Sequence, residues 1–392
     1  MKFPEGFTWG TAMSAHQIEG NDKNCDWWDW ELERQGKYKY PLEKSGDACR
    51  SYEMYDEDFS LCQKLNSGAV RISLAWNRIE PKKGEYDEKE IKHYKDVLIS
   101  AKKHNLKVHL TLHHFTSPSW LSKEGGWLNN RSAIHFERYA KKCAMEFSDY
   151  VENISTINEP QVYALMSYVN GTWPPNKKNI FYSLLVQINF LRAHKKAYKA
   201  IKKIKNIPVG IVKNIVWYDK HPKSGNWLDK ITAKILFWLN CDFFIDPIKK
   251  QLDFIGLNYY FTTFISNLKK RNVDDFNSDL GWWINPDGLF NVLKHLRKYD
   301  LPIYITENGV ADSKDSIRER FIKIMLLSCL KAIEEKVNLK GYFYWSLLDN
   351  YEWHEGYWPK FGLCEIDKNT YKRIPRKSFY YYSNICKNNE II

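Results

Sequence analysis

The stretch ISTINEP (residues 154–160) is a short apolar run that ends in Asn158 and Glu159. A second stretch, IYITENG (residues 303–309), repeats this layout, with Glu307 at the end of its apolar run. Continuous runs of this length are typical of strands that are buried on both faces, as the strands of a parallel sheet are. Each stretch is therefore predicted to be a buried strand that carries a glutamate at its carboxyl end.

Similar apolar runs recur along the chain, with helical patterns between them. Amphipathic segments at 89–104, 133–151 and 317–336 have helical spacing. Repeated strand–helix units of this number favour a closed parallel barrel over an open doubly wound sheet. We therefore predict an α/β fold, a single-domain (β/α)8 TIM barrel over residues 1–392. The predicted strands are 7–11, 69–73, 108–112, 154–157, 209–212, 254–257, 303–306 and 342–345.

Composition limits the classes of function. The 392 residues are 44% hydrophobic and 27% charged, an ordinary balance for a globular protein. The formal charge is +12, but the lysines are scattered over amphipathic stretches as on solvated helix faces, so no nucleic-acid partner is predicted. The 8 cysteines show no C-x-x-C motif or Cys/His ligand spacing, so neither a metal nor a cofactor is predicted. The aromatic content of 16% suits core packing and also suits platforms for sugar rings.

The chain shows no targeting or membrane-spanning pattern. Its first residues lack the basic-then-apolar layout of a signal peptide, and no apolar run reaches about 20 residues. We therefore predict a cytoplasmic protein. The least regular stretch, 218–252, contains the apolar run ILFWL (235–239). We interpret this run as a buried crossover helix in preference to a peripheral membrane contact, which would suit alkyl glycosides.

Polar and aromatic residues gather where the predicted strands end. In a (β/α)8 barrel the carboxyl ends of the strands share one rim, and active sites are built there. A solvated charge or a helix cap would explain a single glutamate at such a position. It would not explain two glutamates accompanied by the other polar and aromatic residues at the strand ends. The residues on or after seven of the eight strands are Gln17, Arg71, His113, His114, Asn158, Glu159, Asn258, Tyr260, Glu307, Trp345, Glu352 and Trp353.

Glu159 and Glu307 supply the two carboxyl groups that cleavage of an acetal needs. One protonates the leaving oxygen, the other stabilises an oxocarbenium-like transition state, and no metal is required. If the carboxyl groups lie about 5 to 5.5 Å apart, one acts as a nucleophile and the anomeric configuration is retained. Arg71 would keep one carboxylate ionised, and Tyr260 could add a hydrogen bond to it. These residues alone do not decide which glutamate receives Arg71.

In collinear order over essentially the whole chain, the sequence resembles glycoside hydrolase family 1, the β-glucosidase/β-galactosidase family of clan A. It looks most similar to archaeal β-glycosidases. The segments that carry the resemblance are FTWGTAMSAHQIEG (7–20), VRISLAWNRIEP (70–81), LTLHHF (110–115), TINEP (156–160), DFIGLNYY (253–260), YITENG (304–309), YFYWSLLDNYEW (342–353) and KFGL (360–363).

The resemblance implies a retaining, exo-acting β-glycosidase that hydrolyses β-D-glucosides, β-D-galactosides or both through a covalent glycosyl-enzyme intermediate. It implies that Glu159 is the acid/base and Glu307 the nucleophile, with Arg71 and Tyr260 holding the nucleophile and Asn258 supporting it. The residues implied to bind the sugar in the −1 subsite are Gln17, His114, Asn158, Trp345, Glu352, Trp353 and Phe361. Among these, Asn158 would bond the 2-hydroxyl, and Gln17 and Glu352 the 4-hydroxyl.

The chain also departs from the family pattern. Phe115 stands where a Trp is common, and Lys360 replaces an Arg before Phe361. The chain is short for the family around 175–255 and between strands six and seven, in loops that build the aglycone side. A 6-phosphate would meet like charge at Glu352, so a neutral sugar is favoured. An intact glutamate pair argues against a binding barrel without catalysis, whereas a transglycosidase stays open.

Overall fold

The computed structural model describes residues 1–34, 43–273 and 276–391. The core of the molecule is formed by β1 (Thr8–Ala12), β2 (Ala69–Ser73), β3 (Lys107–His113), β4 (Asn153–Asn158), β5 (Val209–Asn214), β7 (Phe254–Asn258), β10 (Ile303–Asn308) and β11 (Leu339–Trp345). These strands form a closed barrel in the order β1-β11-β10-β7-β5-β4-β3-β2. All eight predicted strands overlap them, and the predicted (β/α)8 barrel is confirmed. Residues 35–42, 274–275 and 392 of the predicted 1–392 domain lie outside the described residues.

The barrel closes because β1 pairs in parallel with both the second and the last barrel strand. Ala12 lies opposite Trp345 of β11 on one side and opposite Arg71 of β2 on the other. Gly309 stands just beyond β10, where an added Cβ would overlap the carbonyl oxygen of Trp345. Only glycine allows this close approach, which sets the course of the chain directly after Glu307.

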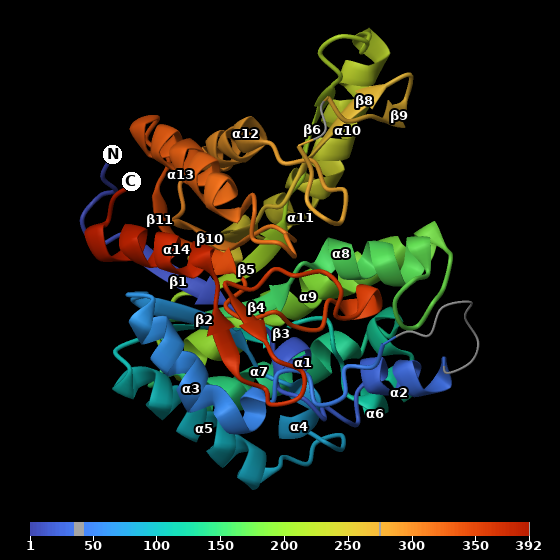
Figure 1. Ribbon diagram of the computed structural model, residues 1–392. Helices are drawn as coiled ribbons and strands as arrows, with labels where there is room; N and C mark the ends of the chain where they lie inside the picture. Colours follow the sequence, from blue (N-terminus) through green and yellow to red (C-terminus); the bar gives the residue numbers. More distant parts are fainter. Residues whose placement is uncertain (35–42, 274–275, 392) are drawn as a thin grey trace.

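Helices cover the outside of the barrel (Figure 1). The longer ones are α3 (Ser51–Lys64), α5 (Glu88–Lys103), α7 (Ser132–Phe147), α9 (Ile180–Ile204), α12 (Pro286–Leu296), α13 (Arg318–Glu334) and α14 (Lys377–Asn388). Helix α5 shows why they form. The Asp87 side chain caps it by accepting from the backbone N–H groups of Lys89 and Glu90, at 2.8 and 3.3 Å. Its buried face then repeats at helical spacing, with Ile91, Tyr94, Val97, Leu98 and Ala101.

Short elements surround the rim at the carboxyl ends of the strands. They are α1 (Ala15–Ile18), α2 (Asp26–Glu33), α4 (Trp76–Ile79), α6 (Ser119–Lys123), α8 (Pro160–Leu165), β12 (Cys364–Ile366) and β13 (Arg373–Pro375). Helix α1 follows β1 and α8 follows β4, so each positions a polar residue directly at the rim. These two connections place Gln17 and Glu159.

Two segments, one between β5 and β7 and one directly after β7, leave the barrel and together build a projecting unit. This unit consists of β6 (Trp217–Lys220), α10 (Trp227–Asn240), α11 (Asp242–Ile245), β8 (Thr262–Ser266) and β9 (Lys269–Lys270). Strands β6, β8 and β9 form a small sheet, and α10 packs against β6, β8 and α11. Figure 1 shows α10 and this sheet at the upper right, extending away from the barrel body.

The predicted crossover helix exists, but the prediction that residues 235–239 are buried is wrong. Ile235, Trp238 and Leu239 are 53%, 48% and 44% exposed, and Phe237 is the buried member of the run. The reason is that α10 covers a narrow three-stranded sheet rather than the barrel, so one side of the helix suffices for packing. No helix among the described residues is long and apolar enough to cross a membrane.

Candidate active site

A cavity of about 390 Å³ opens at the carboxyl ends of the barrel strands. Most of the residues that the sequence predicted for the site line it. These are Gln17, His114, Glu159, Tyr260, Glu307, Trp345, Glu352, Trp353 and Phe361. The other predicted residues, Arg71, Asn158 and Asn258, lie behind this lining and bond to it. The rim pattern of the sequence therefore converges on one cavity.

Glu307, on β10, is surrounded by groups that stabilise its charge. Its Oε1 forms an ion pair with Nη1 of Arg71, whose side chain is only 1% exposed. Its Oε2 accepts a hydrogen bond from the hydroxyl of Tyr260 at 2.6 Å. A buried carboxylate with a cation and a strong donor is favoured in its ionised form. Arg71 thus joins Glu307, which answers the question that the residues alone left open.

Glu159, directly after β4, has a different environment. Its Oε1 accepts from Nδ2 of Asn258 at 2.7 Å and from Nδ2 of Asn214 at 3.2 Å. Burial and the charge of Glu307 raise the pKa of Glu159 to about 8. A carboxyl group with such a pKa is largely protonated at neutral pH, as a general acid must be. The two glutamates of the cavity therefore differ in charge state because of their neighbours.

Two findings here differ from the sequence prediction. Asn258 was expected to support Glu307, but its amide donates to Glu159 at 2.7 Å. Asn214 was not predicted as a site residue at all. The rule that polar residues at strand ends form the site would have found it, but strand five was predicted to end at Val212, whereas β5 continues to Asn214.

One side chain links the environments of the two glutamates. Oδ1 of Asn158 accepts from Nη2 of Arg71 at 2.7 Å and from Nδ2 of Asn258 at 3.3 Å. Because Arg71 holds Glu307 and Asn258 holds Glu159, these contacts form one continuous buried network. Such networks hold side chains in fixed geometry when every member is satisfied.

The part of the cavity beside β1 and β11 is polar. Nε2 of Gln17 lies 3.4 Å from Oε2 of Glu352, and its Oε1 accepts from the Ser14 hydroxyl at 2.6 Å. Burial and the charges of Glu307 and Glu159 raise the pKa of Glu352 to about 8. This carboxyl group can therefore either donate or accept at neutral pH, and together with the Gln17 amide it offers hydrogen bonds to a hydroxyl-bearing ligand.

His114 lies among aromatic rings at the floor of the cavity. Its ring is nearly parallel to those of Trp345 and Trp353, with centroids 6.1 and 6.0 Å away. Burial and the charge of Arg71 hold the pKa of His114 well below its usual value, so the ring is neutral. Its Nδ1 is buried and has no hydrogen-bond partner among the described residues. The His114 ring therefore lines the cavity without carrying a charge.

The outer part of the cavity is lined by eight apolar residues that the sequence did not single out, with polar residues such as Asn240 and Lys270 beside them. The eight apolar residues are Val162, Leu165, Met166, Trp173, Val216, Phe261, Leu280 and Trp282. Phe115, which stands where a Trp is common in the resembled family, packs against Trp173 with ring centroids 4.8 Å apart. Val162 and Leu165 come from α8, Met166 from the helical turn after it, and the others from connecting segments, where no strand-end rule applies. The outer cavity therefore suits an apolar group.

Three lining residues have left-handed backbone conformations. The φ angles are +69° at Phe115, +43° at Glu159 and +51° at Trp353. Non-glycine residues adopt this conformation at a cost of about 1 to 3 kcal/mol each, and such positions concentrate at functional sites. Packing around the cavity must hold these three residues in place.

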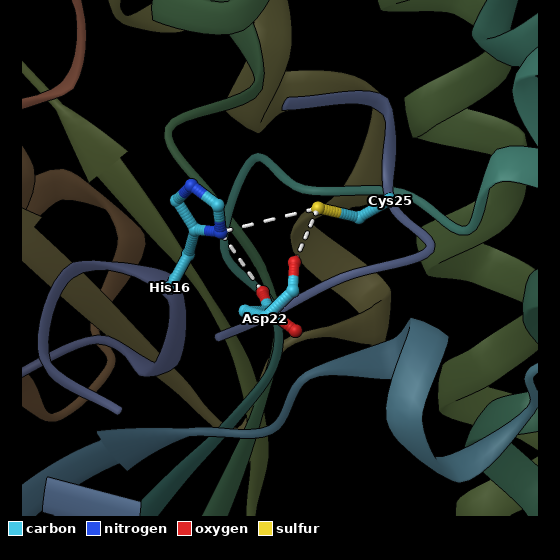
Figure 2. Close-up of side chains that lie close together, drawn as sticks. All are labelled: His16, Asp22 and Cys25. Atoms are coloured by element: carbon cyan, nitrogen blue, oxygen red, sulfur yellow. Dashed lines mark hydrogen bonds and ion pairs between the residues drawn. The ribbon is translucent and has the colours of Figure 1, made fainter. Parts of the chain in front are cut away.

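A buried group behind the site could be mistaken for a metal centre. His16, Asp22 and Cys25 lie with their potential ligand atoms within 4.8 Å of one another (Figure 2). The His16 Nδ1 is 2.9 Å from Oδ2 of Asp22, and the Cys25 thiol donates to the Asp22 carbonyl at 3.2 Å. Burial raises the pKa of the Cys25 thiol to about 12, so the thiolate that a metal would need is strongly disfavoured.

The role that fits this group is support of the cavity wall. Burial alone would lower the pKa of His16, but its hydrogen bonds with Asp22 and Cys25 raise it well above the usual value. The charged His16 ring stacks on Trp353 with centroids 5.7 Å apart and an interplanar angle of 8°. The group thereby fixes the indole that borders the sugar-sized part of the cavity.

Residues 1–250 and 245–391 match the sequence profile of Glycosyl hydrolase family 1. The chain belongs to glycosyl hydrolase family 1. The resemblance seen in the sequence is thereby confirmed, and the protein is a glycoside hydrolase of the family that contains β-glucosidases and β-galactosidases.

Several family 1 proteins are similar to the chain over its full length. A β-galactosidase of Pyrococcus woesei is 31% identical, covering 99% of this chain and 98% of the relative. The structure of a β-glycosidase from Pyrococcus horikoshii has a TM-score of 0.93 and 36% identity, covering 100% of this chain and 96% of the other. A β-glucosidase from Thermotoga maritima in complex with glucoimidazole has a TM-score of 0.92 and 30% identity, covering 100% of both chains.

Proposed function

We propose that this family 1 enzyme is a retaining, exo-acting β-glycosidase with Glu307 as nucleophile and Glu159 as acid/base. The observation that carries the proposal is the unequal environment of the two glutamates. Glu307 is paired with Arg71 and Tyr260 and is held as a carboxylate, whereas the pKa of Glu159 is raised to about 8. A pair with these opposite charge states is what double displacement at an acetal needs.

In the first step, a Glu307 carboxylate oxygen attacks the anomeric carbon, and Glu159 gives its proton to the departing glycosidic oxygen. The product is an ester between the sugar and Glu307. Once Glu307 has lost its charge, the pKa of Glu159 falls, because part of its elevation comes from that charge. Glu159, now a carboxylate, takes a proton from water as the water attacks the anomeric carbon. The ester bond breaks, Glu307 leaves as a carboxylate, and the β configuration is restored.

We propose a neutral β-D-glucosyl or β-D-galactosyl unit for the inner part of the cavity. Gln17 and Glu352 would bond the 4-hydroxyl, and their flexible donor and acceptor pattern tolerates either configuration there. Asn158 and His114 would bond hydroxyls nearer the anomeric carbon, Trp345 would lie beneath the ring, and Phe361 would flank it. The similar proteins described above include a β-galactosidase and a β-glucosidase, which supports the same two sugars.

For the leaving group we propose an apolar alkyl or aryl aglycone. The outer cavity is lined by Leu165, Met166, Phe261 and Trp282, among other apolar residues, and would bury such a group favourably. Transfer to an alcohol acceptor in place of water uses the same intermediate and remains compatible with this lining.

The test is hydrolysis of aryl and alkyl β-D-glucosides and β-D-galactosides, followed by proton NMR from the first turnovers. We expect the β anomer of the free sugar to appear before mutarotation produces the α anomer. Initial release of the α anomer would contradict the retaining mechanism. An absence of turnover on both sugars would contradict the proposed inner subsite.

A further inference from the structure

Helix α10 carries an apolar face that the barrel does not cover. Six of its large apolar side chains are exposed, by between 44% for Leu228 and 70% for Trp227. These six are Trp227, Leu228, Ile231, Ile235, Trp238 and Leu239. At about 100° per residue they all fall within an arc of roughly 120° on one side of the helix. Contiguous exposed patches of this kind mark interaction surfaces.

The opposite side of α10 accounts for its packing on the small sheet. Asp229, Ala233 and Phe237 are buried, at the i, i+4 and i+8 positions. Asp229 closes a capping box with Asn226, and its carboxylate also accepts from the backbone N–H of Leu268 at 2.8 Å. Leu268, at the β8–β9 turn, is itself 63% exposed and lies near the start of the helix.

Basic residues are frequent in the projecting segments, and Lys230 and Lys234 of α10 lie along one edge of the apolar face. The projecting segments 217–240 and 262–271 contain seven exposed cations, Lys220, Lys223, Lys230, Lys234, Lys269, Lys270 and Arg271. None of them forms an ion pair with a described residue. The same segments contain two carboxylates, Asp219 and Asp229, and Asp229 is buried and bonded to backbone N–H groups. These two segments therefore carry a large excess of positive charge.

We propose that α10 docks this protein on an anionic lipid surface. The helix would lie in the plane of the interface, with its apolar face between the acyl chains and its border of lysines at the headgroups. Trp227 and Trp238, near its two ends, have the amphipathic rings that favour this depth. At about 1.5 Å per residue the 14-residue helix presents roughly 21 Å of contact.

A second copy of the chain explains these features less well. Two α10 faces packed against each other would bring both sets of cations together without carboxylates to offset them, and that arrangement is unfavourable. Anionic headgroups supply the missing charge, and each nearby lysine or arginine is attracted to them. The projecting position of the unit (Figure 1) leaves the helix free to reach a flat surface.

The orientation that follows brings the cavity near the lipid. Tyr218 of β6, Asn240 of α10 and Lys270 of β9 all belong to the projecting unit and also line the outer cavity. Docking through α10 would therefore hold the mouth of the cavity beside the membrane surface. This orientation rests on the described fold and does not require the proposed substrate class.

The experiment is flotation of the full-length protein with phosphatidylglycerol-containing vesicles and with pure phosphatidylcholine vesicles, at low and high salt. The apolar face is tested with the double variant Ile235→Asp/Trp238→Asp. The matched control is Ile134→Asp/Met145→Asp, which alters two residues of α7 that are 54% and 59% exposed. A charge variant, Lys230→Glu/Lys234→Glu, tests the basic border. Turnover of a soluble aryl glycoside confirms folding of each variant.

We expect the wild type and the α7 control to float with anionic vesicles, more strongly at low salt. Both α10 variants should bind at least about tenfold more weakly. The proposal is overturned if the wild type stays with the soluble fraction, if it floats equally with neutral vesicles, or if the α10 variants bind like the control. It is also overturned if sedimentation shows a dimer that Ile235→Asp/Trp238→Asp dissociates, because a second copy would then occupy the face.

Discussion

The hydroxyl of Tyr260 donates a 2.6 Å hydrogen bond to Oε2 of Glu307, on the side opposite the Arg71 ion pair. The two contacts together satisfy both carboxylate oxygens and fix the plane of the group. A nucleophile needs this orientation, because its lone pair must point at the anomeric carbon in line with the leaving oxygen. The hydroxyl also stabilises negative charge as the covalent ester breaks down.

Removing this hydroxyl should lower the rate without unfolding the protein. For Tyr260→Phe we expect kcat to fall by about 10- to 100-fold, since a hydrogen bond to a charged group contributes about 1.5 to 3 kcal/mol. The matched control is Tyr259→Phe, because the Tyr259 hydroxyl bonds the Asn285 carbonyl at 2.7 Å and does not touch Glu307. Steady-state kinetics and thermal melts of both variants check this, and equal rate losses in the two would contradict the role of Tyr260.

The raised pKa of Glu159 predicts the alkaline limit of activity. Burial and the charge of Glu307 raise it to about 8, so the proton needed for the leaving oxygen is lost as the pH rises through that value. We expect kcat/KM for an alkyl glycoside to decline above about pH 8. In Glu159→Gln the residual kcat/KM on an activated aryl glycoside should lack this decline. A decline that persists unchanged in the variant would assign it to another group.

Asn214 should also influence the pKa of Glu159. Its hydrogen bond to Glu159 stabilises the ionised carboxylate and lowers its pKa. In Asn214→Ala the alkaline decline of kcat/KM should therefore move to higher pH, while the rate at lower pH changes by less than about tenfold. The pH profile is the measurement, and a shift toward lower pH would show that the bond acts in the opposite sense.

Buried carboxyls at the site also make stability depend on pH. In the folded protein, burial and the charges of Glu307 and Glu159 raise the pKa of Glu352 to about 8. In the unfolded chain its pKa is about 4.3. The folded state then binds more protons between these values, so stability falls as the pH rises from about 4.3 to 8. In Glu352→Gln the fall in Tm between pH 5 and pH 8 should be smaller. Calorimetry tests this, and an identical pH dependence in both proteins would contradict it.

Lys213 makes stability depend on pH in the opposite direction. This residue of β5 is fully buried, its Nζ has no hydrogen-bond partner among the described residues, and burial lowers its pKa to about 7. The unfolded chain therefore binds more protons from about pH 7 to 10.4, and stability contributed by neutral Lys213 rises over that range. Lys213→Met should raise Tm at pH 7 by an amount that shrinks toward pH 10. A lower Tm at pH 7 would show that the ammonium has a stabilising partner.

The barrel was predictable because parallel strands buried on both faces are continuous apolar runs, as in ISTI at 154–157. The glutamates were predictable because their strands end at a rim common to all eight. Asn214 was not predicted as a site residue because two polar residues, Lys213 and Asn214, follow the apolar run and indicated that the strand had ended. In the structure Lys213 is buried and the strand continues. Strand length, unlike strand existence, depends on burial that the residue type does not reveal.

Helix α10 shows a different limit of prediction from the sequence. An apolar run such as 235–239 indicates a preference for burial, but not which surface provides it. Here the partner is a small sheet built from β6, β8 and β9, whose segments are separated in sequence by the helix itself and by β7. The outer cavity has the same difficulty, because Trp173 and Trp282 reach it from separate loops. Such arrangements depend on tertiary packing rather than on local pattern.

The most direct test of the account is hydrolysis of an aryl β-glycoside by Glu307→Gly with and without azide. Without azide the variant should have no turnover, since no carboxylate can form the glycosyl ester. Azide fits the space left by the side chain and attacks the same face of the sugar, while Glu159 still protonates the leaving oxygen, so turnover should return with the α-glycosyl azide as product. Full activity of the variant without azide, or formation of the β-glycosyl azide, would contradict Glu307 as the nucleophile.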